Sequence, residues 1–99
     1  MKEYLIRRKD NDFCEVKLNR FDDVLRPNSF ESTKIEGWGH HRIQVDNCAI
    51  AFSFEEVGIQ ISFENCEISD KKAQKIVDEI CLNVEKEINS SCYSIQISD

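Results

Sequence analysis

The sequence predicts an α+β fold: an antiparallel sheet of about five to six strands, with one long amphipathic helix packed on one face. Apolar residues recur at helical spacing over residues 70–89, and they alternate with period two over residues 42–64 and 93–98. The two patterns occupy separate segments, as is typical of α+β domains. A chain of 99 residues is expected to form a single domain, residues 1–99.

The predicted helix runs from about Asp70 to Asn89. Its apolar stripe consists of Ala73, Ile76, Val77, Ile80, Val84 and Ile88. Ser69 is a natural N-cap, because its hydroxyl can accept a hydrogen bond from a first-turn N–H, and Asp70 favours the positive end of the helix dipole. Each large side chain of the stripe contributes about 1.5–3 kcal/mol when it is buried. The stripe therefore has to be covered, and the sheet is the expected cover.

Period-two alternation predicts strands over residues 42–46, 48–54 and 59–64, with Gly58 in the short hairpin loop between the last two. After the helix, Tyr93, Ile95 and Ile97 alternate with polar residues and predict a final strand. We therefore expect one apolar sheet face and one face of small and polar side chains.

The first forty residues are less regular. Residues 4–9 and 13–18 are predicted as two strands joined by a turn. Phe21, Val24 and Leu25 suggest one helical turn that Pro27 ends. Residues 28–41 are expected to form a loop.

The cysteines and the hydropathy pattern predict a cytosolic protein. The five cysteines, Cys14, Cys48, Cys66, Cys81 and Cys92, are odd in number and contain no C-x-x-C pair. No apolar run approaches the roughly 20 residues that span a bilayer, and the charged N-terminus lacks the apolar stretch of a secretory signal. We expect the cysteines to stay thiols and to pack as small apolar side chains, with a disulfide framework as the alternative.

Catalytic and metal-binding patterns are absent from the sequence. Adjacent residues of a strand point to opposite faces, so His40 and His41 are poorly placed to chelate together. Glu55 and Glu56 form a carboxylate pair, but at a hairpin tip without a cleft. We expect no enzymatic activity, no metal and no cofactor. A small hydrolase or a thiol enzyme is the alternative.

The net charge of −6 is concentrated in one segment. Residues 1–45 carry nine basic and eight acidic residues, and residues 71–99 carry four and five. Residues 46–70 contain no Lys or Arg and six acidic residues: Asp46, Glu55, Glu56, Glu64, Glu67 and Asp70. The predicted strands place Glu55 and Glu56 at the hairpin tip and the other four near its opposite end. Such a surface repels nucleic acid and attracts a basic protein; the alternative is a set of solvated turn residues.

Trp38 is a further candidate binding residue. It lies between Gly37 and Gly39 in the predicted loop. Tryptophan is enriched at the hot spots of protein interfaces, so an exposed Trp38 would suit an anchor for a partner. In the alternative, its indole caps one edge of the small core.

In size, acidity and its sheet-plus-helix pattern, the chain resembles bacterial immunity proteins, the cognate inhibitors of contact-dependent growth-inhibition and related polymorphic toxins. The resemblance is to overall character, and it carries over no functional residue. It implies a cytoplasmic protein that binds and blocks a toxin domain, often a basic nuclease. The six acidic residues and Trp38 are then the candidate partner-binding residues. The alternative is a small adaptor or assembly domain that binds a protein through its sheet edge or polar sheet face. No nucleic-acid or membrane partner is expected.

Overall fold

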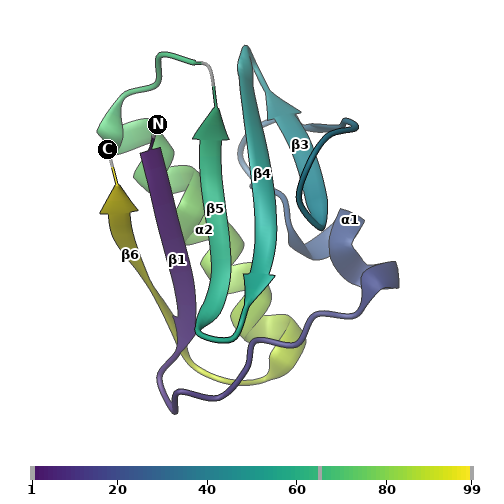
Figure 1. Cartoon of the computed structure of the whole chain (residues 1–99), viewed down its shortest axis with the longest axis vertical. Helices are drawn as coiled ribbons and strands as arrows, with labels where there is room; N and C mark the ends of the chain where they lie inside the picture. The colour runs from purple at the N-terminus through teal and green to yellow at the C-terminus, as the bar shows by residue number, and fades with distance from the viewer. Residues whose placement is uncertain (1, 65, 99) are drawn as a thin grey trace.

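The computed structural model describes residues 2–64 and 66–98, and over these it shows one antiparallel sheet of six strands in the order β2-β3-β4-β5-β1-β6 (Figure 1). The strands are β1 (Lys2–Arg8), β2 (Thr33–Lys34), β3 (His41–Val45), β4 (Cys48–Glu55), β5 (Gly58–Glu64) and β6 (Cys92–Ser98). The helices are the 3₁₀ turn Leu18–Arg20, α1 (Phe21–Val24) and α2 (Asp70–Ile88). The predicted α+β class is confirmed.

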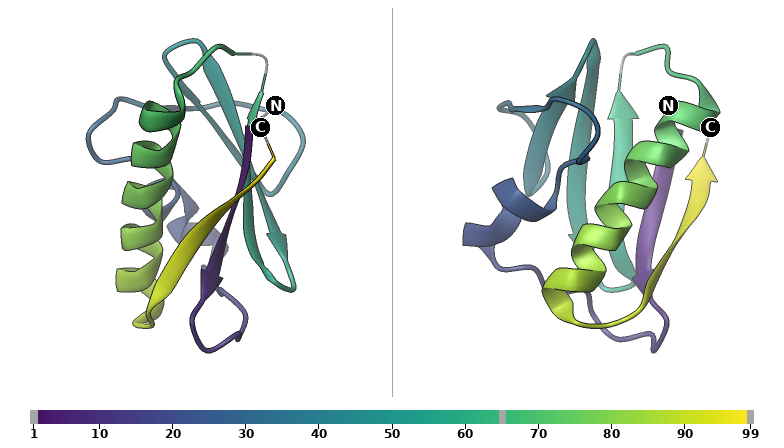
Figure 2. Two further views of the ribbon diagram at one scale, coloured as in Figure 1. Left: turned by 90° about the vertical axis from the view of Figure 1, so that its left-hand side faces the viewer. Right: turned by 180° about the vertical axis from the view of Figure 1, so that it is seen from behind.

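Helix α2 runs along one face of the sheet (Figure 2). It begins as predicted, because the N–H of Lys72 donates to the Ser69 hydroxyl at 3.1 Å. It ends at Asn89, whose φ of 54° is left-handed. The core of its stripe is fully buried: Ala73, Ile76, Val77, Ile80 and Val84. No described helix is long and apolar enough to cross a membrane.

The sheet face beneath α2 forms the rest of the core. Antiparallel register pairs Ile43 with Ile50 and Phe52 with Ile61, so period-two alternation places these side chains on the same face. All four are at most 3% exposed. The alternation predicted for β3, β4 and β5 is therefore confirmed. We call the opposite face, turned away from α2, the open face.

Strand β6 does not follow the expected orientation. Ile95 pairs with Leu5, and Ser94 pairs with Ile6 of the core. Ile95 is therefore on the open face, where 41% of its surface is exposed. Ser94 faces the helix instead, and its hydroxyl accepts a hydrogen bond from Gln74 of α2 at 3.2 Å. The expectation of a wholly small and polar open face is wrong at β6, because this strand runs beside a polar flank of the helix.

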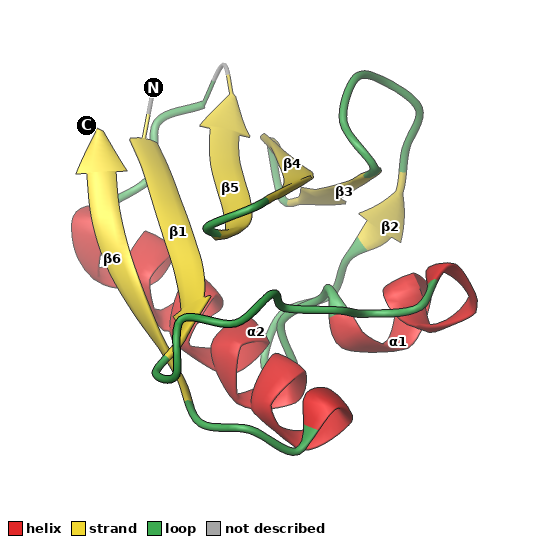
Figure 3. Cartoon of the chain, turned by 60° about the horizontal axis from the view of Figure 1, so that its bottom comes forward, coloured by secondary structure: helices red, strands yellow, loops and turns green. Residues whose placement is uncertain are grey.

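The strand predicted over residues 13–18 is also wrong. Cys14 and Val16 are buried and alternate with exposed neighbours, but the segment pairs with none of the described strands. It crosses the end of the sheet between β1 and α1 (Figure 3), and its period-two pattern reflects contact with the core on one side only. The helical turn predicted next is confirmed by α1. The predicted loop 28–41 contains β2 and ends in the first residue of β3.

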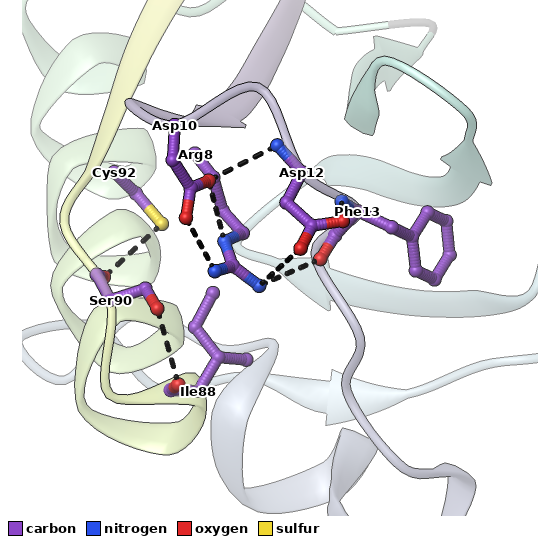
Figure 4. A network of polar contacts seen from close by, with 7 residues as sticks. All are labelled: Arg8, Asp10, Asp12, Phe13, Ile88, Ser90 and Cys92. Atoms are coloured by element: carbon purple, nitrogen blue, oxygen red, sulfur yellow. Dashed lines mark hydrogen bonds and ion pairs between the residues drawn. The ribbon is translucent and has the colours of Figure 1, made fainter.

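The turn after β1 is organised by Arg8 (Figure 4). Its guanidinium lies 2.6 Å from the Asp10 carboxylate and donates to the carbonyl of Phe13 at 3.3 Å. The N–H of Asp12 also donates to Asp10, at 3.1 Å. The hydrogen bond from Arg8, followed by that from Asp12, lowers the pKa of Asp10. These contacts fix the turn that leads from β1 to the buried Cys14.

Two of the five cysteines form a disulfide, so the expectation that all would remain thiols is wrong. Cys48 and Cys66 are bonded, with their Cα atoms 5.0 Å apart. Cys48 begins β4 and Cys66 lies two positions after the last residue of β5, so the antiparallel hairpin brings them together. Their 18-residue separation is uninformative until that pairing is known.

His41 is buried at the end of β3, with 5% of its surface exposed, between the rings of Phe21 and Phe52. Burial lowers its pKa; Asp22 partly opposes this shift and Lys34 adds to it. The folded chain therefore binds a proton to His41 less readily than the unfolded chain does. We expect its contribution to the free energy of unfolding to be complete above the unfolded pKa near 6.5 and to be lost as the pH falls below it.

Denaturant unfolding of the wild type and of His41→Gln between pH 5 and pH 8 measures this effect. The wild type should lose stability over the range below pH 6.5 more steeply than the variant. Parallel curves would contradict the assignment.

Candidate partner-binding surface

Three of the six acidic residues have basic partners within the chain, and two of these three are exposed. Asp46 lies in the turn between β3 and β4, 2.5 Å from the ammonium of Lys72. Asp70, at the start of α2, lies 2.6 Å from the ammonium of Lys2. These carboxylates are exposed, so each pair contributes only about 0–1 kcal/mol to stability. The pairs nevertheless offset the negative charge at this end of the hairpin.

The opposite end of the hairpin carries unbalanced charge. Glu55 and Glu56 are exposed at the tip, as predicted, and Glu55 accepts a hydrogen bond from the hydroxyl of Ser53 at 3.2 Å. Neither forms an ion pair with any described residue. Glu67 is exposed before α2 and is likewise unpaired within the described chain. The predicted acidic surface is thus reduced to Glu55 and Glu56 at the tip and the separate Glu67.

Glu64 has a different role from the other acids, because only 6% of its surface is exposed. Its carboxylate forms an ion pair with Arg42 of β3, whose side chain is 15% exposed. β4 lies between these two strands, and its residues on the open face at this point are Ala49 and Ala51. Their short side chains leave room for Arg42 to lie across β4 and reach Glu64.

The same carboxylate holds Trp38. The indole N–H of Trp38 donates to Glu64 Oε2 at 2.5 Å. Glu64 follows the core residue Phe63, so its side chain and the indole that binds it lie on the open face. Trp38 is 51% exposed and lies outside the hydrophobic core. The alternative expectation, that the Trp38 indole caps one edge of the core, is therefore wrong.

The glycines beside Trp38 permit this geometry. A Cβ at Gly37, where φ is +153°, would lie 2.5 Å from the Arg42 side chain. A Cβ at Gly39, where φ is +96°, would lie 2.8 Å from the carbonyl oxygen of Phe52. His40 then fastens the loop to β4, since its N–H donates to that same carbonyl at 2.8 Å. The two glycines thus let the loop lie close against the sheet, while the side chain of Trp38 stays outside the core.

Between Trp38 and β6 the open face is polar. Glu3 accepts hydrogen bonds from Gln60 at 2.7 Å and from the hydroxyl of Ser62 at 3.1 Å. Beyond β1, the apolar side chains of Ile95 and Ile97 are 41% and 47% exposed. The open face therefore combines an exposed aromatic side chain, a polar centre and an apolar margin; aromatic residues such as Trp38 are enriched at protein interfaces.

The free thiols lie elsewhere. Cys14, Cys81 and Cys92 are buried. Burial is the main cause that raises the pKa of Cys14, that of Cys81 to about 11 and that of Cys92 to about 12. Because the thiolate is the reactive form, these groups hold little nucleophile at neutral pH.

We expect Cys14, Cys81 and Cys92 to react slowly with a thiol-specific disulfide reagent in the native protein at pH 7 and rapidly after unfolding. A single thiol that reacts quickly in the native state would contradict this expectation and favour the thiol-enzyme alternative.

Within the described part of the chain, no three His, Cys, Asp or Glu side chains gather as metal ligands. Comparison with protein-family models, with curated protein sequences and with solved structures gives no match. Function is therefore inferred from the geometry and charge of the chain itself.

Proposed function

We propose that this chain is a non-catalytic protein-binding domain whose partner docks on the open face at Trp38. The observation that carries the proposal is that the Trp38 side chain is exposed to solvent and yet held in place by a hydrogen bond. Trp38 leaves 51% of its surface to solvent, yet its indole N–H is bound to a buried carboxylate that is itself paired with Arg42.

A side chain that is already held in place favours binding, because flexible side chains lose conformational entropy when they become ordered at an interface. A side chain that is already ordered avoids about 0.5–1.5 kcal/mol of that cost. Tryptophan also offers a large contact area, and truncation of such an anchor typically weakens binding by about 2 kcal/mol or more. The two exposed isoleucines of β6 would extend the contact.

The test compares three immobilised forms of the full chain: the wild type, Trp38→Ala and Val57→Ala. Val57 is a matched control, because it is 53% exposed but lies in the turn of the β4–β5 hairpin. A protein captured from the source cell by the wild type and by Val57→Ala, but lost with Trp38→Ala, is the expected result. Calorimetry should then give a dissociation constant raised about 25-fold or more in Trp38→Ala. Equal binding by all three forms would refute the proposal.

A second candidate is neutralisation of a basic toxin domain, the function that the resemblance to immunity proteins implies. It is favoured by Glu55 and Glu56, which are exposed and unpaired within the described chain, and by the net charge of −6. Such binding should weaken as salt rises and should be lost on reversal of Glu55, Glu56 and Glu67 to Lys. Glu64 is left unchanged, since its reversal would disrupt the buried ion pair. Binding that is insensitive to both changes would reject this candidate.

The disulfide bears on where the chain acts. Disulfides persist in oxidising compartments and are usually reduced in the cytosol. The proposed cytoplasmic location thus requires the bond between Cys48 and Cys66 to be open in the cell. Acid quenching, alkylation and mass measurement of protein from intact cells should then find five alkylated thiols. Three alkylated thiols would place the chain in an oxidising compartment.

A further inference from the structure

The three free thiols of the chain lie in the core at the same end of the sheet. Cys14 comes from the segment after β1, Cys81 from α2 and Cys92 from the start of β6, and all three belong to the buried core cluster. None of them has more than 8% of its surface exposed. Binding at Trp38 uses none of these thiols, because that residue lies on the opposite face of the sheet.

Two of the thiols are in direct contact, since the S–H of Cys92 donates a hydrogen bond to the sulfur of Cys14. The strand register explains how they meet. Ile6 of β1 pairs with Ser94 and Arg8 pairs with Cys92, so Cys92 and Ser94 both face α2 from the strand beside β1. The thiol of Cys14 lies over β1 on the same side, 3.8 Å from the carbonyl oxygen of Ile6.

Only one member of this pair is held in the sheet. Cys92 belongs to β6, its N–H donates to the Glu85 carboxylate at 2.7 Å, and its sulfur lies 3.6 Å from the carbonyl oxygen of Ser90 (Figure 4). Cys14 lies between β1 and α1, in a segment that pairs with none of the described strands. Two sulfurs in contact as thiols must approach to about 2.05 Å to bond. The unpaired segment can supply that movement, whereas Cys81 is fixed within α2.

We propose that Cys14 and Cys92 are an oxidisable thiol pair, which a low-molecular-weight disulfide such as glutathione disulfide converts into a second disulfide bond of the chain. The Cys14 thiolate attacks one sulfur of the small disulfide, forms a mixed disulfide and releases one thiolate. The Cys92 thiolate then attacks the sulfur of Cys14, forms the internal bond and releases the second thiolate. The two cysteine protons pass to the released thiolates, and the two electrons reduce the small disulfide.

The surroundings favour Cys14 as the first nucleophile. Burial raises the pKa of both thiols, but the hydrogen bond from Cys92 and the guanidinium of Arg8 oppose this shift at Cys14. The negative charges that Cys14, Cys81 and Glu85 carry when ionised add to the shift at Cys92. Local opening of the unpaired segment would also expose Cys14 while β6 stays in place. The first step should therefore be slow at neutral pH, and the second should follow quickly because Cys92 lies beside the mixed disulfide.

Oxidation of the full chain by glutathione disulfide, followed by alkylation and mass measurement, tests the proposal. The number of alkylated thiols should fall from three to one, with no bound glutathione and with the bond between Cys48 and Cys66 intact. Trypsin places the three free cysteines on separate peptides, residues 10–17, 76–86 and 87–99. The new bond should link residues 10–17 to residues 87–99 and leave Cys81 alkylated. The melting temperature should rise by roughly 10 °C or more.

Single alanine variants separate the two exchange steps. Cys92→Ala lacks the second nucleophile, so glutathione should remain attached to Cys14. Cys14→Ala lacks the first, so it should take up no glutathione under the same conditions. Cys81→Ala is the matched control, because it removes a buried thiol that takes no part and should still form the internal bond. Circular dichroism of each variant, with a spectrum like that of the wild type, shows that the fold is retained.

Three results would overturn the proposal. The first is an internal bond that includes Cys81. The second is a wild type that keeps three alkylated thiols under conditions in which glutathione disulfide reacts with the urea-unfolded chain. The third is a wild type that accumulates bound glutathione without the internal bond. None of these measurements involves a partner, so their outcome is independent of whether binding at Trp38 is found.

Discussion

Replacement of Arg42 by methionine is expected to lower the free energy of unfolding by about 3–5 kcal/mol, because it leaves the buried carboxylate of Glu64 without its cation. Methionine retains much of the apolar stem that lies across β4, so lost packing contributes little. Urea unfolding followed by circular dichroism measures the change.

Lys72→Met provides the matched control. It removes the same type of charge from an ion pair with Asp46, but both side chains of that pair are substantially exposed. Its cost should be at most about 1 kcal/mol. The double variant Arg42→Met, Glu64→Leu should recover much of the loss, because it removes both buried charges together. If Arg42→Met cost no more than Lys72→Met, the pair would not be buried as described.

Most of the fold could be predicted from the sequence because local patterns and tertiary packing agree over α2 and β3–β5. The helix stripe and the strand alternation both point into a single core, and Ser69 caps the helix where expected. Prediction failed where a pattern had two physical causes. Cys14 and Val16 alternate because they cover the end of the core, with no neighbouring strand. The residues of β6 alternate between apolar and polar, but the register with β1 decides which of the two sets faces α2.

The candidate site was only partly predictable for a related reason. Trp38 and its two glycines could be singled out, since a bulky residue between two unhindered ones is unusual. Its partner Glu64 was grouped with the surface acids, because sequence position does not show that Arg42 crosses β4 to reach it. A signal was present: Ala49 and Ala51 are the small residues over which such a crossing is possible. It becomes readable only when the register of β3, β4 and β5 is known.

Replacement of both Cys48 and Cys66 by serine is expected to lower the free energy of unfolding by roughly 3 kcal/mol, the chain-entropy value for a loop of about this length. For a domain of this size the melting temperature should fall by roughly 12–24 °C. Differential scanning calorimetry of the wild type and the variant, with and without dithiothreitol, measures the effect. The reductant should bring the wild type to the level of the variant and leave the variant unchanged.

The disulfide also encloses the part of the molecule on which the binding proposal depends. The loop between Cys48 and Cys66 contains β4, β5 and Glu64, the acceptor of the Trp38 indole. Main-chain pairing and the ion pair to Arg42 hold Glu64 independently of the covalent bond. The reduced protein should therefore be less stable while it remains folded, with its tryptophan fluorescence unchanged below the melting transition. If reduction shifted the emission of the folded protein, the position of Trp38 would depend on the bond, and its anchor function would be coupled to the redox state of the surroundings.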